Sequence, residues 1–205
     1  MSLTFILNAL YFKAGWTSPF DSEHQVYKGQ PFRTGGGEVA VDYLCSDEYL
    51  LYVDSDSFRA AFRPLGDKEA YDIAILLPKD DDGIGGLLET LPLLDIGSLR
   101  KSASVSELYF RAPVFETTSS YDIGEQLRAM GVRQAFTEDA QFGNMFAGAD
   151  TYISKVLHKA RIDLNAGGIE GAAVTSVEIE VGASGGERPP MFYADHPFVY
   201  IISER

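Results

Sequence analysis

A strictly alternating segment near the C-terminal end of the chain constrains its fold more than any other feature. Between residues 169 and 181, every second residue is apolar or small, and β-branched residues dominate the second half. Alternation with a period of two is typical of a strand that buries one face. The inward set is Ile169, Gly171, Ala173, Thr175, Val177, Ile179 and Val181, and the interleaved set is Glu170, Ala172, Val174, Ser176, Glu178 and Glu180.

The flanks of this segment have the composition of an exposed connection. It begins at Gly167 and Gly168 and leads into the glycine-rich residues 182–186. Glycine and serine favour turns and flexible links over strand interiors. The segment therefore combines the composition of a loop with the alternation of a strand.

Composition and charge limit the class of protein. With 205 residues, 45% of them hydrophobic, the chain has enough apolar material for a sizeable core, and we expect a single globular domain over residues 1–205. The formal net charge of −13 repels phosphate backbones and anionic lipid, so we expect no nucleic-acid and no membrane partner. No apolar run approaches the roughly 20 residues of a membrane-spanning helix. The single cysteine, Cys45, excludes an internal disulfide and is expected to be a small buried hydrophobe.

Elsewhere, the hydrophobic pattern predicts a β-rich fold with two helices. The predicted helices cover residues 85–99 and 121–130, and Gly131 is placed as the C-terminal stop of the second. The predicted strands lie at 3–13, 39–43, within 49–62, at 71–77, 108–117 and 152–164, and at 192–202 with a break at His196 and Pro197.

The residues that could carry chemistry form no catalytic or metal-binding pattern. Three histidines occur without an HExxH motif or a cysteine pair. Asp80, Asp82, Gly83 and Glu89 match four positions of a calcium-binding loop, but Pro78 stands at its first ligand position. No serine lies in a G-x-S-x-G elbow. We therefore expect no catalytic residue, no bound metal and no cofactor, and we expect that the protein is not an enzyme.

Several segments, in collinear order, resemble the serpins, the serine protease inhibitor family. The first is residues 7–16, Leu-Asn-Ala-Leu-Tyr-Phe-Lys-Ala-Gly-Trp, followed by Pro19 and Phe20. Further similar segments are residues 74–78, 121–123, 156–160 and 196–200. The resemblance covers essentially the whole chain, from the third strand of the main serpin sheet through the reactive loop.

The resemblance implies a fold and a function. The fold is α+β and β-rich, with a large mixed sheet, a second sheet and a reactive-centre loop at about residues 166–190. The function is suicide-substrate inhibition of a serine or cysteine protease, in which the cleaved loop inserts into the sheet as a strand and traps the acyl-enzyme. This mechanism needs a loop that can become a strand, and the alternation of residues 169–181 supplies one. The alternatives are a non-inhibitory serpin-like interaction module and an inactive truncated fragment.

The resemblance also assigns residues to the moving parts. Asn8 and His158 correspond to polar residues beneath the opening sheet, and Trp16 lies near its top, where the loop enters. Ordinary core positions are the alternative for His158 and Trp16. The reactive-loop hinge comprises Gly167, Gly168, Ile169, Glu170, Gly171, Ala172, Ala173, Val174 and Thr175. This hinge departs from the inhibitory pattern at residues 166–169 and 171, yet introduces no charge or proline that would block insertion.

The scissile bond and the partner follow from counting along the loop. Counting from Gly168 places the bond after Gly182, whereas counting back from Pro197 places it near Gly186. The candidates are Gly182, Ala183, Ser184, Gly186 and Glu187. Small residues suit a protease with a small specificity pocket, such as an elastase-like or subtilisin-like enzyme. Cleavage after Arg188 is disfavoured because Pro189 follows it.

The resemblance implies a secreted or cell-surface protein, although the N-terminus has no signal-peptide pattern. A complete serpin has a helical region and further strands before residue 3 and a final strand after residue 205. We therefore expect this chain to expose strand edges and apolar faces, and to associate with the missing half of the domain or with another copy of itself.

Overall fold

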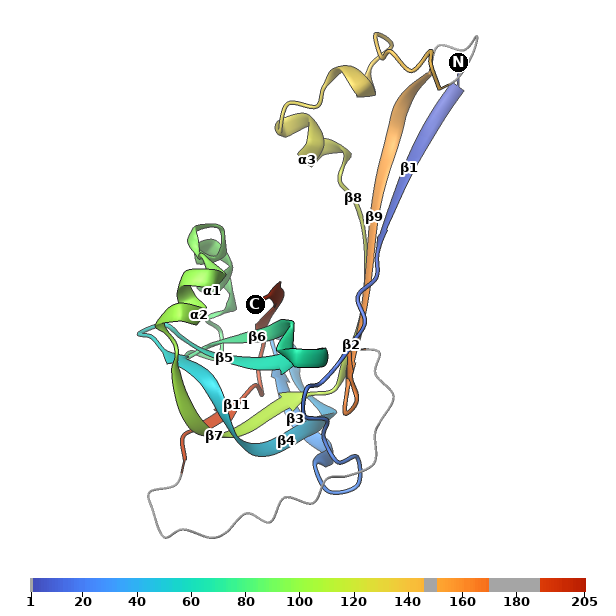
Figure 1. The fold of residues 1–205 in the computed structure, drawn as a ribbon. Coiled ribbons are helices and arrows are strands. Elements are labelled where there is room, and N and C mark those ends of the chain that lie inside the picture. Colours follow the sequence, from blue (N-terminus) through green and yellow to red (C-terminus); the bar gives the residue numbers. More distant parts are fainter. Residues whose placement is uncertain (1, 146–150, 170–188) are drawn as a thin grey trace. The chain divides into compact units, whose positions relative to one another are not determined.

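The computed structural model describes residues 2–145, 151–169 and 189–205 (Figure 1). Contacts divide the chain into two compact units: Met1–Phe12 with Glu116–Ile162, and Lys13–Phe115 with Asp163–Arg205. A single domain over residues 1–205 stays a prediction.

The first unit is built around the long strand β9 (Thr151–Asn165), whose last residues continue into the second unit. Strand β9 pairs with β1 (Ser2–Leu10) in parallel and also with β8 (Phe115–Asp122) (Figure 1). Helix α3 (Gly124–Ala129) and the 3₁₀ turn η3 (Gln134–Phe136) follow β8. Phe136, Ile153 and Val156 form the buried cluster of this unit.

Strand β1 presents apolar side chains to solvent within the described structure. Phe5, Leu7 and Leu10 are 64%, 63% and 61% exposed. Several large exposed apolar side chains on one strand are unusual for a monomer. They are typical of a surface that contacts another protein chain.

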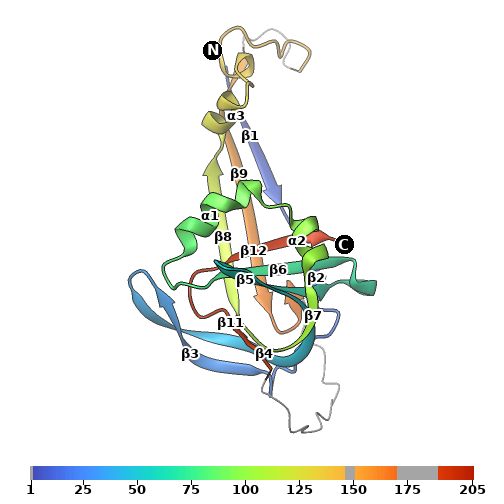
Figure 2. The same ribbon diagram turned by 90° about the vertical axis from the view of Figure 1, so that its left-hand side faces the viewer.

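The second unit contains a seven-stranded mixed sheet. Its strand order is β11-β7-β4-β5-β6-β12, with β3 paired to β4, and among the strands that the structure describes in this sheet only β11 and β7 pair in parallel. Strands β3 and β4 form a long curved hairpin (Figure 2). The strands are β3 (Val26–Thr34), β4 (Gly37–Asp54), β5 (Phe58–Leu65), β6 (Tyr71–Pro78), β7 (Ser104–Pro113), β11 (Met191–Tyr193) and β12 (Val199–Glu204). The short strands β2 (Ala14–Gly15) and β10 (Gly168–Ile169) pair with each other, and β10 also pairs with the end of β9, so these strands belong to the sheet of β1, β8 and β9. The 3₁₀ turn η1 (Asp67–Glu69) joins β5 to β6.

The continuous apolar run of β6 reflects burial on both faces. Ala74 and Leu76 pack into a cluster with Leu87 of α1 (Ile84–Thr90), while the alternate residues Ile73 and Ile75 are equally buried. Figure 1 shows α1 and α2 (Ile96–Ser102) beside β5 and β6. A strand covered on both faces needs no polar alternation, and the predicted strand at 71–77 is confirmed.

The predicted helix at 85–99 is wrong as a single element. It is two seven-residue helices, α1 and α2, separated by the 3₁₀ turn η2 (Leu91–Leu93). Pro92 cannot donate a backbone hydrogen bond and ends the first helix. Asp95 begins the second, because its side chain accepts a hydrogen bond from the backbone N–H of Gly97 at 3.0 Å.

The second predicted helix, at 121–130, is shorter than expected. Tyr121 and Asp122 end strand β8, and α3 begins at Gly124. The Asp122 carboxylate accepts from the backbone N–H of Gly124 at 3.1 Å, which explains its place before the helix. The predicted stop is confirmed, since Gly131 follows the helix with φ +101°.

The structure corrects one further prediction and confirms two others. The predicted strand at 108–117 is divided into β7 and β8 at Val114, after Pro113. Cys45 is buried and unpaired, as predicted. Burial raises the pKa of its thiol. The strand-rich α+β class is confirmed.

Candidate functional site

The predicted loop hinge begins with a tight turn and a two-residue strand. After β9 ends at Asn165, the chain reverses through Ala166 and Gly167. Gly168 and Ile169 then form β10, which runs antiparallel to the end of β9 and antiparallel to β2. The first hinge residues therefore already occupy a strand position between β9 and β2.

Three consecutive backbone carbonyls of this turn accept hydrogen bonds from the segment that contains Trp16 and Phe20. The indole Nε1–H of Trp16 donates to the carbonyl of Asn165 at 2.8 Å. The backbone N–H of Phe20 donates to Ala166 at 3.1 Å, and that of Trp16 donates to Gly167 at 3.1 Å. We call these three bonds the hinge clamp. They fix the turn from one side.

Position 168 accepts only glycine. Gly168 has φ +129°, and a Cβ atom there would lie 2.5 Å from the carbonyl oxygen of Ala14 and 2.6 Å from Cα of Gly15. Side chains rarely adopt that conformation, and the obstructing atoms are backbone. The close approach allows β10 to pair with β2. The next residue, Ile169, is fully buried, so the fold accommodates its bulky side chain at this position.

Trp16 is both a core residue and a part of the hinge clamp. Its side chain is 4% exposed and packs edge-to-face on Phe20 with ring centroids 5.6 Å apart. Its backbone forms an antiparallel bridge with Leu65. The core position that the sequence allowed for Trp16 is therefore confirmed, and its part in sheet opening stays a prediction.

We expect Trp16→Phe to destabilise the chain by about 1–3 kcal/mol, because the carbonyl of Asn165 loses its donor while the ring packing is largely kept. Urea unfolding followed by far-ultraviolet circular dichroism measures the change. Tyr49→Phe is the control, since Tyr49 is 70% exposed and should change stability by less than about 0.5 kcal/mol. Equal effects of the two substitutions would contradict a structural role for the indole N–H.

Asn8 and His158 lie opposite each other in the register of β1 and β9, in the first unit. Asn8 is exposed and His158 is half-buried. Their side chains make no hydrogen bond with each other or with other residues that the structure describes. Their part in sheet opening stays a prediction.

The C-terminal side of the loop is held by apolar contacts. Strand β11 lies parallel to β7, and the backbone N–H of Tyr109 donates to the carbonyl of Pro190 at 3.1 Å. Phe192 is fully buried and stacks on Phe110 with ring centroids 5.8 Å apart. This pair ties residues just after the loop to the core of the second unit.

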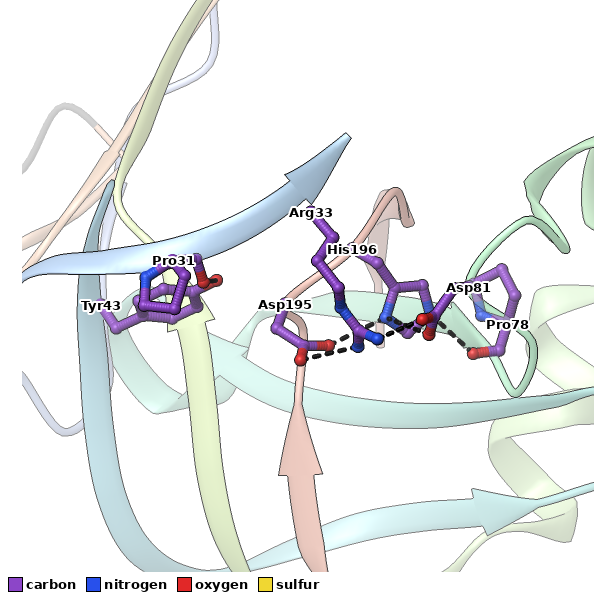
Figure 3. Close-up of polar contacts among 7 residues, drawn as sticks. All are labelled: Pro31, Arg33, Tyr43, Pro78, Asp81, Asp195 and His196. Carbon is purple, nitrogen blue, oxygen red and sulfur yellow. Dashed lines mark hydrogen bonds and ion pairs between the residues drawn. The ribbon is translucent and has the colours of Figure 1, made fainter. Parts of the chain in front are cut away.

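A polar cluster secures the connection between β11 and β12 (Figure 3). Arg33 donates to the Asp195 carboxylate at 2.8 Å and also pairs with Asp81. The bond to Asp195 raises the pKa of the Arg33 guanidinium. The buried His196 ring lies 2.9 Å from both Asp195 Oδ1 and the carbonyl oxygen of Pro78. His196 therefore has polar partners at both ring nitrogens and joins this connection to the end of β6.

The remaining hinge and loop predictions concern residues that the structure does not describe. Outside the described residues lie the hinge positions Glu170, Gly171, Ala172, Ala173, Val174 and Thr175 and the scissile-bond candidates Gly182, Ala183, Ser184, Gly186 and Glu187. Within residues 2–145, 151–169 and 189–205, no group of three or more histidine, cysteine or acidic side chains is placed to hold a metal ion. The same residues include no helix that is long and apolar enough to cross a membrane.

Two residues at the hinge were not predicted from the sequence. Asn165 supplies a carbonyl to the clamp, and its side chain accepts from the backbone N–H of Gly167 at 2.9 Å. Arg63 is a buried cation behind Trp16 and Phe20. A sequence signal for Arg63 exists in principle, since it stands in the last, mostly apolar residues of β5.

Comparison with known proteins gives the family. The serpin (serine protease inhibitor) family model matches residues 1–205. The chain is 32% identical to leukocyte elastase inhibitor from Bos taurus, across 98% of this chain and 54% of that protein. It is 31% identical to Iripin-2 from Ixodes ricinus, across 98% and 50%.

A solved structure agrees with this result. Serpin48 from the insect Tenebrio molitor is similar with a TM-score of 0.80 and 26% identity, across 98% of this chain and 52% of that one. The chain spans about half the length of the curated relatives it matches. With a family match over its whole length and a shared strand-rich fold, the chain belongs to the serpin family of serine protease inhibitors.

Proposed function

We propose that this chain supplies the inserting loop and the receiving strands of a suicide-substrate protease inhibitor. One observation carries the proposal: Gly168 and Ile169 lie as β10 between the end of β9 and β2, antiparallel to both. A strand that continues from β10 would follow the same path, with residues 170–181 alternating between buried and exposed sides.

Pairing geometry supports insertion. Strands β1 and β9 are paired directly and in parallel, for instance at Asn8 and His158. A strand inserted between them would replace one parallel pairing with two antiparallel ones. Antiparallel pairing is slightly more stable per residue, and there is one more ladder of hydrogen bonds. Cleavage of the loop would therefore release free energy through sheet expansion.

The chemistry in this mechanism belongs to the protease. Its nucleophile attacks the scissile carbonyl, the new N-terminus leaves as the amine, and the acyl-enzyme remains attached to the cleaved loop. Insertion carries the attached protease away and distorts its catalytic geometry before water completes hydrolysis. The inhibitor contributes a strand and a hinge and is consumed once.

The partner we propose is a protease with a small specificity pocket. The loop residues 182–187 are small except for Glu187, and a relative at 32% identity is named for elastase. Action outside the cell and association with the half of the fold absent from this chain, or with a second copy, belong to the same proposal. The exposed apolar side chains of β1 support the association.

A protease panel tests the proposal, with this chain and with a full-length serpin that contains it. We expect a denaturant-resistant complex with an elastase-like or subtilisin-like enzyme, and cleavage within residues 182–187 by mass spectrometry. Cleaved protein should also unfold at a higher temperature than uncleaved protein. A trypsin-like protease is the control.

Cleavage after Arg188 would refute the scissile-bond assignment. If the full-length protein formed no complex with any protease and gained no thermal stability on cleavage, the non-inhibitory alternative would replace this proposal. The departures from the inhibitory pattern at residues 166–169 and 171 are the observation that favours that alternative.

A further inference from the structure

A buried cation lies directly behind the hinge clamp. The Arg63 side chain is 4% exposed, and its guanidinium carbon lies 4.4 Å from the ring centroid of Trp16 and 4.0 Å from that of Phe20. Its Nη2 donates to the carbonyl of Ser18 at 2.7 Å. Arg63 thus contacts the beginning, the middle and the end of the segment whose donors form the clamp.

Glu48 holds this cation from the neighbouring strand. The Arg63 Nε–H donates to Glu48 Oε1 at 2.9 Å, and Ser46 also donates to that carboxylate. The guanidinium is therefore fixed at three places: by the carboxylate, by the Ser18 carbonyl and by the two aromatic faces. These hydrogen bonds and ring contacts hold the planar guanidinium in one orientation. The ammonium of a flexible lysine side chain would not be fixed in this way.

Core stability alone does not explain an arginine here. Burial lowers the pKa of Arg63, the Glu48 carboxylate opposes that shift, and Nη1 has no hydrogen-bond partner among the described residues. Buried ion pairs commonly stabilise a fold no better than apolar side chains of similar volume. What an apolar side chain could not do is bond to the Ser18 carbonyl and hold both rings at once.

We propose that Arg63, held by Glu48, is a positioning residue for the hinge. It holds the backbone of residues 16–20 so that the three clamp donors stay aligned with the carbonyls of residues 165–167. The effect of Arg63 on loop insertion rests on the proposed function. If the loop inserts, the hinge clamp sets how readily the hinge leaves its place or extends into the sheet. A looser clamp changes the rate of loop insertion.

The clamp can be observed without a protease, since Trp16 is the only tryptophan of the chain. The double variant Arg63→Met/Glu48→Gln removes the pair and leaves no uncompensated charge. We expect its Trp16 fluorescence to move to longer wavelength, and the backbone amides of Trp16 and Phe20 to exchange hydrogen about tenfold faster, as expected for one weakened hydrogen bond. Amides of β6 should keep their exchange rates.

Arg63→Lys tests geometry separately from charge. It keeps a cation near Glu48 but loses the planar fork, so the same two amides should again exchange faster. Arg59→Met on the same strand is the matched control, because in the described structure no hydrogen bond, ion pair or ring contact joins the Arg59 side chain to residues 16–20, unlike that of Arg63. It should leave the fluorescence and both amides unchanged.

Unchanged Trp16 emission and amide exchange in the double variant and in Arg63→Lys would overturn the inference. Uniformly faster exchange across the second unit, β6 included, would also overturn it, since Arg63 would then serve only overall stability. A failed protease panel would leave these readouts intact. It would remove the proposed function but not the positioning role of Arg63 at the turn.

Discussion

Gly168→Ala should displace β10 from its place between β9 and β2. The added Cβ would lie 2.5 Å from the Ala14 carbonyl oxygen and 2.7 Å from the backbone nitrogen of Trp16, and no rotamer relieves a clash with backbone. Strain at φ +129° adds about 1–3 kcal/mol to the steric penalty. We therefore expect a loss of at least about 1–3 kcal/mol in the free energy of unfolding, or a displaced hinge.

Urea unfolding and hydrogen exchange distinguish these two results. A displaced hinge shows as faster exchange at residues 164–169 with nearly unchanged global stability. Gly35→Ala is the control, because a Cβ there meets nothing within 4 Å. Wild-type stability together with wild-type exchange at residues 164–169 in Gly168→Ala would show that the close approach of β10 to β2 does not exist.

Phe192→Ala should destabilise the second unit by about 3–5 kcal/mol, the range for removing a large buried ring. The Phe192 ring is fully buried, lies parallel to Phe110 at an interplanar angle of 5°, and contacts Tyr52 edge-to-face with centroids 6.4 Å apart. Alanine would leave a cavity lined by these two rings. Strand β11, which follows the loop, would lose the buried ring that packs it against β7.

The neighbouring residue supplies a matched control for this measurement. Met191 is on the same short strand but is 54% exposed, so Met191→Ala should change the free energy of unfolding by less than about 0.5 kcal/mol. Both variants are compared by urea unfolding. If Phe192→Ala lost no more stability than Met191→Ala, β11 would not be anchored through its ring.

The two ends of the loop are held by different forces, and the difference suits the proposed function. The N-terminal end is held by backbone hydrogen bonds between short strands, a type of contact that an inserting strand can extend rung by rung. The C-terminal end is held by buried aromatic rings, which do not slide without losing packing. Under the proposed function, cleavage would release the first end into the sheet, while the second end would stay in place.

Strands and helix ends differ in how far they follow from local pattern. The burial of β6 on both faces is visible in its unbroken apolar run, and the stop at Gly131 is visible as a glycine after a helical pattern. The break between α1 and α2 depends on Pro92 and the cap at Asp95, which compete with an apolar pattern that would continue as helix. The start of α3 depends on how far β8 extends along β9. That length is set by strand pairing in the tertiary structure and not by the local sequence.

By itself, the sequence determined the alternation of residues 169–181, which predicts a strand, and the glycines that precede it, because alternation and backbone freedom are properties of neighbouring residues. It also carried the family resemblance, now confirmed by the family match. Only the tertiary structure decided that Gly168 and Ile169 lie between β9 and β2 and that Trp16, Phe20 and Arg63 hold the turn before them. Residues 16, 63 and 165 are far apart in sequence, and no local pattern specifies bonds that depend on long-range strand pairing.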